Sequence, residues 1–321
     1  MSGVVDGCGL TGMGVVRQLA ANPAVSRIGV ATASEDRRVL AGDILGPKVC
    51  DAGALEHPDV AIIAAAPLDH DDRAKVWLAK GAHVVSVSSD VEDLDRLAVL
   101  GPAAEQAGRS VIVGAGLAPG LTSLLAVHAM AWFDEVTEIR ISSYGVAGPA
   151  CARSVQRSLH EESEEWRDGE WVLRAPGSGR ELSWFPDPVA GRDCYAARTG
   201  EARVLHQLVP TISRISSRVS RPEVPRLRRI LPLGRPWSVD PIGAIRVEVR
   251  GARAGRSDTL VYGLVDRPSV ASAAVAVTAA MAVVSGSVAS GVGSIAQLSP
   301  VPFLRSLSAL GVRAAVFEGT D

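Results

Sequence analysis

The chain has 321 residues, 47% of them hydrophobic, and a mean hydropathy of +0.19. This is long enough and apolar enough for two domains with a substantial buried core. The formal net charge of -2 gives no reason to expect nucleic acid or an anionic membrane as a partner.

The cysteines and the apolar runs predict where in the cell the protein is found. Four scattered cysteines lack the C-x-x-C spacing of a zinc or redox site, which predicts a reduced, cytoplasmic protein without a metal. The N-terminus enters a strand directly, so we expect no signal peptide. The longest apolar run, 270–284, is short for a membrane span and predicts a buried helix.

The most informative motif opens the chain. Residues 7–12, GCGLTG, form a G-x-G-x-x-G between Val4-Val5, a predicted strand, and an amphipathic run typical of a helix. In a dinucleotide-binding turn, the first glycine allows the sharp turn, the second lets a pyrophosphate approach, and the third lets the helix pack closely on the sheet. The helix N-terminus then faces the phosphates. The alternative is a turn without a ligand. The predicted cofactor-binding residues here are Gly7, Gly9, Leu10, Thr11 and Gly12.

The second predicted strand, 27–33, ends where such sites carry an acid for the ribose 2′-hydroxyl of NAD. The sequence there is TAS at 32–34, followed by EDRR at 35–38. Serine and paired arginines suit a 2′-phosphate, which favours NADP. NAD remains the alternative, with Glu35 or Asp36 on the ribose. The predicted ribose-binding residues are Thr32, Ser34, Arg37 and Arg38.

Strands and helices then alternate regularly. Strands are predicted at 48–51, 59–66, 83–89 and 109–114, and helices at 71–80, 93–107 and 122–132. This pattern predicts an α/β fold with an N-terminal Rossmann domain, a doubly wound parallel sheet. Loops at the carboxyl ends of its strands should line one crevice. They add Ala66, Pro67, Ser88 and Gly116 as predicted cofactor contacts, and His70 and Pro119 as predicted substrate contacts.

Two of these loops have alternative interpretations. His70 could cap the helix that follows it. Loop 114–120, GAGLAPG, could be a glycine–proline hinge between domains.

Four stretches together resemble the saccharopine dehydrogenase-like family of NAD(P)-dependent oxidoreductases: GCGLTG at 7–12, AAAP at 64–67, GAGLAPGLTSLLA at 114–126 and LVYGLVDRPSVAS at 260–272. The resemblance implies imine or amine chemistry between an amine and a carbonyl compound, and a homodimer. The chain departs from the family at Ala118 and Ser86, where members often carry acids.

The second half predicts an α+β domain of mostly antiparallel sheet. Strands are expected at 136–146, 171–174, 180–184, 195–198 and 212–220, with a hairpin of 244–250 and 259–265. Helices are expected at 151–167 and 269–284, and 289–311 also has a helical pattern. The predicted domains are 1–130, with 286–321 packing back onto it, and 131–285 for substrate binding and dimerisation.

Imine reduction needs a proton donor beside the nitrogen. Tyr144 and His160 are the predicted catalytic residues, although His160 lies in a charged segment that also suits an exposed helix face. A substrate carboxylate calls for a fork-like arginine. Arg153, Arg157 and Arg174 are the predicted residues for it.

Three hypotheses follow. The first is an NADP-dependent oxidoreductase acting at a C–N bond of a small, carboxylated substrate. The second is a ketone or enone reductase on the same scaffold. The third is a nucleotide-binding protein without redox chemistry, a sensor or a non-redox catalyst, which the departures at Ala118 and Ser86 favour.

Overall fold

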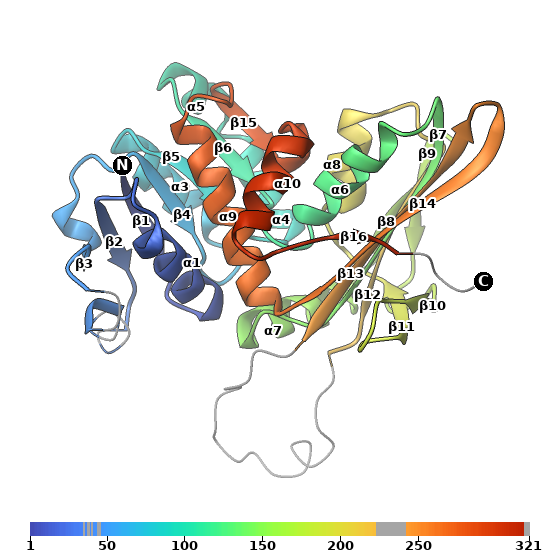
Figure 1. The fold of residues 1–321 in the computed structure, drawn as a ribbon, viewed down its shortest axis with the longest axis horizontal. Coiled ribbons are helices and arrows are strands. Elements are labelled where there is room, and N and C mark those ends of the chain that lie inside the picture. The colour runs from blue at the N-terminus through green and yellow to red at the C-terminus, as the bar shows by residue number, and fades with distance from the viewer. Residues whose placement is uncertain (35, 37–38, 40, 44–45, 223–241, 318–321) are drawn as a thin grey trace, which may run out of the picture. The chain divides into compact units, whose positions relative to one another are not determined.

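The computed structural model describes residues 1–34, 36, 39, 41–43, 46–222 and 242–317 (Figure 1). They form two compact units. The first unit comprises residues 1–124 and 269–312, and the second comprises residues 125–268 with the chain after residue 312.

The first unit is built on a seven-stranded parallel sheet, which confirms the predicted Rossmann architecture. Its order is β15-β6-β5-β4-β1-β2-β3, so the direction of winding reverses between β1 and β4. The strands are β1 Ser2–Asp6, β2 Arg27–Ala31, β3 Val49–Asp51, β4 Val60–Ile63, β5 His83–Ser86, β6 Ser110–Val113 and β15 Gly291–Ser294. β4 is buried along its whole length, as expected for a strand covered on both faces.

The helices of this unit follow from apolar spacing. The buried residues of α1, Leu10–Ala21, are Gly12, Val15, Val16 and Leu19, the i, i+3, i+4, i+7 pattern of one helix face. The other helices are α3 His70–Ala79, α4 Val91–Ala98, α5 Gly101–Gln106, α6 Leu121–Met130, which runs into the second unit, α9 Pro268–Val284 and α10 Pro300–Ala309. Short 3-10 turns lie at Ala52–Ala54 and Ile295–Gln297.

Two helix predictions in this unit were wrong. The segment 93–107 is two helices, because Pro102 lies at the start of α5, where proline fits the first turn but not a helix interior. The segment 289–311 contains strand β15, which pairs in parallel with β6 from Gly291↔Ser110 to Ser294↔Val113. Two glycines in this short run disfavour a helix.

The second unit is a mixed, mostly antiparallel sheet, which confirms the predicted α+β class. Its main order is β10-β11-β12-β7-β13-β14-β16, with β8 paired to β12 and β9 to β8. The strands are β7 Glu135–Tyr144, β8 Ser163–Arg167, β9 Glu170–Arg174, β10 Glu181–Trp184, β11 Gly191–Ala196, β12 Arg214–Ser220, β13 Gly243–Arg253, β14 Arg256–Asp266 and β16 Ala315–Val316. The helices are α7 Pro149–Ser158 and α8 Glu201–Leu208.

One helix prediction in this unit was also wrong. The segment 151–167 is helical only to Ser158, and β8 follows it. The strand form wins because β8 pairs antiparallel with both β9 and β12, a tertiary interaction that outweighs local propensity.

The bounds of the two units differ from the predicted domains in three places. Residues 125–130 belong to the second unit. Helix α9 belongs to the first unit, where Gly14 of α1 packs so closely that a Cβ there would lie 2.9 Å from the Ala273 Cβ. Strand β16 pairs with β14 of the second unit.

Candidate functional site

The glycine turn joins β1 to α1, beside the point where the sheet order reverses. Gly7 has φ +110°, and a Cβ on it would lie 2.6 Å from the backbone of Ala64 and Ala65. A Cβ on Gly12 would lie 1.8 Å from the Gly7 carbonyl oxygen. Both positions therefore require glycine for the turn and its helix to form.

Gly9 differs from Gly7 and Gly12, because neither its backbone conformation nor the surrounding atoms require glycine. Its φ of -74° and ψ of -167° suit any residue, and a Cβ there would meet nothing within 4 Å among the described atoms. Gly9 is the N-cap residue of α1 and has no side chain to cap the helix. The first turn of α1 also contains no acid. Leu10 is exposed and Thr11 half-buried. The turn thus presents uncapped N–H groups and open space, which suits an anionic group.

The end of β2 carries the predicted ribose contacts. Thr32 and Ser34 are half-buried, and the Thr32 hydroxyl accepts from the Ser34 N–H at 3.2 Å. Gly7 N–H donates to the Ala31 carbonyl at 2.8 Å, so the end of β2 is fastened to the glycine turn. Arg37 and Arg38, on which the NADP prediction depends, lie outside the described residues.

A buried carboxylate organises the loops that follow β4 and β5. Asp93 of α4 is 0% exposed. It accepts from the Leu68 N–H at 3.0 Å, from the His70 N–H at 3.4 Å and from the Ser88 hydroxyl at 2.6 Å. Leu68 has φ +87°, a left-handed conformation that costs a leucine free energy. Asp93 therefore fixes a strained loop whose leucine side chain is exposed.

His70 lies beneath the same loops and is 0% exposed. Its Nδ1 lies 2.8 Å from the Ser86 Oγ, and its Nε2 lies 3.4 Å from the Ala65 carbonyl oxygen. Burial lowers the pKa of His70 below its usual value. The structure thus differs from the prediction that His70 contacts substrate: it is a core residue that supports the loop, and Ser86 is its partner.

The remaining predicted contacts of this unit differ in exposure. Ala66 is exposed and Pro67 half-buried, whereas Ser88, Gly116 and Pro119 are buried. The Ser88 hydroxyl is held by Asp93. Pro119 follows a cis peptide bond and packs within loop 114–120, where a Cβ on Gly120 would lie 2.2 Å from the Gly116 carbonyl oxygen. This loop is tightly built within the first unit.

Sequence reasoning missed Asp6, the last residue of β1. Asp6 is buried and accepts from the Trp77 indole N–H at 2.8 Å and from Arg73, which also donates to Asp69 at 2.8 Å. These contacts join α3 to the strand that leads into the glycine turn. An acid that directly precedes the first glycine was the available signal.

In the second unit, the two predicted catalytic residues lie in different surroundings. Tyr144, at the end of β7, is half-buried, with its ring centroid 6.3 Å from that of Phe185. His160 is exposed just after α7, with Nδ1 2.6 Å from the Gln156 carbonyl oxygen. The geometry therefore favours Tyr144 over His160 as a group enclosed by protein.

The three predicted substrate arginines are also distributed differently. Arg153 is exposed on α7. The Arg157 Nε lies 3.8 Å from Glu161, and the Arg174 Nε lies 3.0 Å from Glu165, which is 3% exposed. The structure thus gives Arg157 and Arg174 protein carboxylates as partners, and the carboxylate beside Arg174 is buried.

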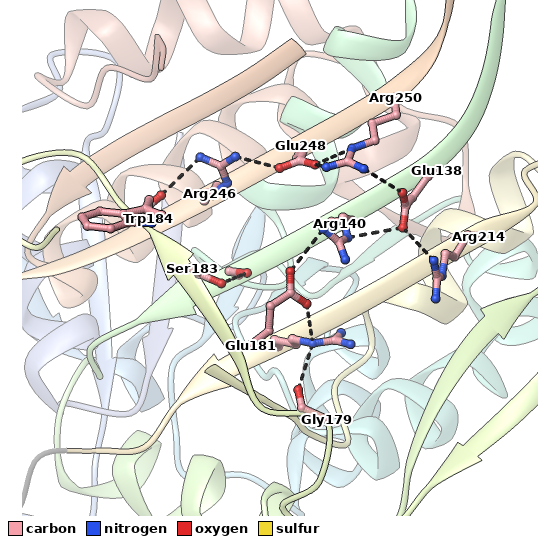
Figure 2. A network of polar contacts seen from close by, with 12 residues as sticks. Glu138, Arg140, Gly179, Glu181, Ser183, Trp184, Arg214, Arg246, Glu248 and Arg250 are labelled. Carbon is pink, nitrogen blue, oxygen red and sulfur yellow. Dashed lines mark hydrogen bonds and ion pairs between the residues drawn. The ribbon is translucent and has the colours of Figure 1, made fainter. Parts of the chain in front are cut away.

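Arg174 begins a chain of ion pairs that continues through Glu165 to Arg218 at 3.0 Å and on to Glu181 at 3.1 Å. Figure 2 shows the part that crosses β7 and β13, where Arg140 links Glu181 to Glu138. The chain ends on β13 through Arg250, Glu248 and Arg246. The six arginines of this chain each have a glutamate partner: Arg140, Arg174, Arg214, Arg218, Arg246 and Arg250.

Within the described part of the chain, no group of three or more His, Cys, Asp or Glu residues is arranged to hold a metal ion. None of the helices described is both long and apolar enough to cross a lipid bilayer.

Comparison with known proteins identifies solved structures of similar fold. No protein-family model matches the sequence, and no curated protein matches it. Among solved structures, apo saccharopine dehydrogenase (L-Glu forming) from Saccharomyces cerevisiae superposes with a TM-score of 0.75 at 15% identity, over 99% of this chain and 100% of that one.

Two further structures are similar. Homospermidine synthase from Legionella pneumophila, in complex with NAD, has a TM-score of 0.73 at 11% identity over 99% and 91% of the two chains. The DAP dehydrogenase of C. glutamicum, in complex with DAP, has a TM-score of 0.57 at 15% identity over 96% and 98%. The chain therefore has a saccharopine dehydrogenase-like fold, which confirms the resemblance at the level of the fold.

Proposed function

We propose that this protein is an NAD(P)-dependent oxidoreductase that transfers hydride at the C–N bond of a small, carboxylated substrate. The observation that carries the proposal is the glycine turn. Gly7 and Gly12 are required by the fold, whereas Gly9 faces open space before an uncapped helix N-terminus. A turn with no ligand would favour glycine at that position only through its modest preference as a helix N-cap.

The residues present fit a dinucleotide. The N–H groups of Leu10, Thr11 and Gly12 would bind the pyrophosphate, and Thr32 and Ser34 would bind the ribose. Ala66 and Pro67, on the loop fixed by Asp93, would contact the cofactor at the end of β4. When bound, the nicotinamide supplies or accepts the hydride; this chain's role is to bind and orient it and to hold a proton for the substrate nitrogen.

The reaction class is supported by the solved structures of similar fold. Two of them are dehydrogenases, one named for forming L-Glu and one holding DAP, and the third is a homospermidine synthase holding NAD. In imine reduction, hydride adds to the imine carbon, a proton adds to the nitrogen, and NAD(P)H is oxidised to NAD(P)+. Tyr144 is our proposed proton donor, because its side chain is half-buried and a phenol holds its proton at neutral pH.

NADP is the proposed cofactor, on the basis of Arg37 and Arg38 in the sequence. Parallel fluorescence titrations with NADPH and NADH test both parts. We expect micromolar binding of NADPH and weaker binding of NADH, with the Arg37→Ala/Arg38→Ala double variant losing about 1–3 kcal/mol of NADPH affinity and little NADH affinity. Equal losses for the two would refute the NADP assignment, and failure of both to bind would refute the function.

A substrate panel separates the reaction classes. Imines formed from 2-oxo acids and amines should oxidise NADPH, whereas simple ketones and enones should not. Tight cofactor binding without stereospecific hydride exchange from labelled NADPH would favour the non-redox alternative.

A homodimer paired through the second unit is also part of this proposal. It is supported by large apolar side chains on β10, with Leu182 55% and Trp184 49% exposed, since such patches often mark interfaces. Light scattering should give twice the chain mass of 33.4 kDa, and Trp184→Glu should halve it.

A further inference from the structure

We propose that Arg192, on β11, binds the carboxylate of the substrate, with the Tyr144 ring as its platform. The inference rests on the proposed function only in calling that ligand a substrate. The anion site itself is argued from contacts within the second unit.

The Arg192 side chain lies on the same face of the hairpin as Ser183 and reaches the Tyr144 ring. It lies directly opposite Ser183 in the β10–β11 pairing, so the two side chains share one face of the hairpin. The Ser183 hydroxyl is buried and lies 2.9 Å from that of Ser142 on β7. Tyr144 follows two residues later on the same face of β7. Accordingly, the Arg192 guanidinium carbon lies 5.0 Å from the centroid of the Tyr144 ring.

The acids of strands β10 and β11 already have arginine partners other than Arg192. The nearest acid of β10, Glu181, already pairs with Arg140 and Arg218, and Asp193 pairs with Arg180 at 2.9 Å. Within the described residues, Arg192 forms no ion pair, and its Nε is buried without a hydrogen-bond acceptor. It thus differs from the six arginines of the neighbouring ion-pair chain, each of which has a glutamate.

This arrangement of Arg192 favours a carboxylate as its ligand. A buried N–H of a cation without an acceptor costs free energy until an acceptor arrives. A guanidinium held against an aromatic ring keeps its in-plane N–H fork available, and that fork matches the two oxygens of a carboxylate. An amino acid or 2-oxo acid supplies such a group, whereas its neutral amide does not.

This assignment replaces the arginines predicted from sequence. Arg174 already has a buried glutamate, so a ligand carboxylate would have to compete with Glu165. Arg153 is exposed, where a charge pair contributes little. Arg192 is half-buried and lacks a carboxylate, which is the combination that a specific anion site needs.

The test observes Arg192 directly by NMR of its Nε–Hε group in the full chain, without nicotinamide. The probes are pyruvate and L-alanine, matched by pyruvamide and L-alaninamide, and inorganic phosphate. We expect the two carboxylates to shift the Arg192 resonance saturably and the amides to leave it unchanged. A response to neither carboxylate, an equal response to the amides, or a response to phosphate alone would overturn the proposal.

Variants separate binding from folding. Arg192→Lys keeps the charge but not the fork, and we expect it to weaken pyruvate binding at least tenfold, as measured by isothermal titration calorimetry. Arg180→Gln, an exposed arginine beside the same hairpin, is the matched control and should bind pyruvate as the wild type does. Equal affinity in Arg192→Lys and wild type would overturn the assignment.

Failure here and failure of the proposed function are distinguishable. Loss of NADPH binding with intact pyruvate binding would refute the cofactor proposal alone. Tyr144→Phe keeps the ring and should retain pyruvate binding while losing cofactor-dependent turnover; loss of pyruvate binding in that variant would contradict the platform role of the ring.

Discussion

Replacing Gly9 by alanine tests whether the glycine turn binds a ligand or only shapes the chain. The added Cβ meets no described atom within 4 Å, and the backbone at Gly9 suits alanine. Alanine gains about 0.4–1 kcal/mol of stability by restricting the unfolded chain and loses about 1 kcal/mol as a poorer N-cap. The free energy of unfolding should therefore change by less than about 1 kcal/mol.

Cofactor binding should respond differently. The same methyl group occupies the space through which a pyrophosphate must approach the N–H groups of α1. We expect NADPH and NADH affinities to fall at least tenfold, about 1.4 kcal/mol. Fluorescence titration gives the affinities, and urea unfolding of the same preparations gives the stability.

Two other glycines are the controls. Gly12→Ala puts a Cβ 1.8 Å from the Gly7 carbonyl oxygen and should destabilise the fold by about 1–3 kcal/mol. Gly101→Ala, in open space at the start of α5, should change neither quantity appreciably. If Gly9→Ala bound NADPH and NADH with wild-type affinity, the turn would be structural and the nucleotide proposal would lose its main support.

Three further predictions concern buried polar groups. Asp93→Asn should destabilise the protein by about 1–3 kcal/mol and weaken NADPH binding, because it loosens the loop around Leu68. The control Glu56→Gln, at an exposed position, should stay within about 0.5 kcal/mol of wild type in urea unfolding. His70 stays neutral in the fold because burial lowers its pKa, so the unfolded chain binds more protons below about pH 6.5. The melting temperature should therefore fall from pH 7 to pH 5, and less so in His70→Gln. An unchanged slope would contradict this role, since the other histidine with a lowered pKa, the half-buried His83, is present in both. Glu165→Gln should cost about 1–3 kcal/mol, because it leaves Arg174 without its carboxylate and Arg218 with Glu181 alone. Little change is expected for the exposed Glu170→Gln, and equal unfolding midpoints would refute a stabilising ion-pair chain.

The first unit could be predicted from sequence because its signals are local. A glycine turn between a strand and a helix involves neighbouring residues, and a strand buried on both faces, such as β4, has a continuous apolar run. The misses depended on distant partners. β15 contains two glycines and has strand form because β6 offers it an edge.

The supporting residues of the candidate site could not be predicted for the same reason. Asp93 lies on a helix 25 residues after Leu68, and nothing in the local sequence indicates that its carboxylate turns inward to hold that loop. Asp6 was closer to a signal, since it directly precedes Gly7, but its partners Arg73 and Trp77 lie on α3.

The choice among arginines shows most clearly what the fold adds. In the sequence alone, nothing distinguishes four arginines that could each bind a carboxylate: Arg153, Arg157, Arg174 and Arg192. What distinguishes them is which glutamates the strand register places beside each one. β8 pairs with β9 so that Glu165 reaches Arg174, whereas β10 and β11 place Ser183 opposite Arg192. An arginine opposite a serine and against an aromatic ring keeps its charge for a ligand, so the register of two hairpins, rather than any motif, selects the proposed substrate-binding residue.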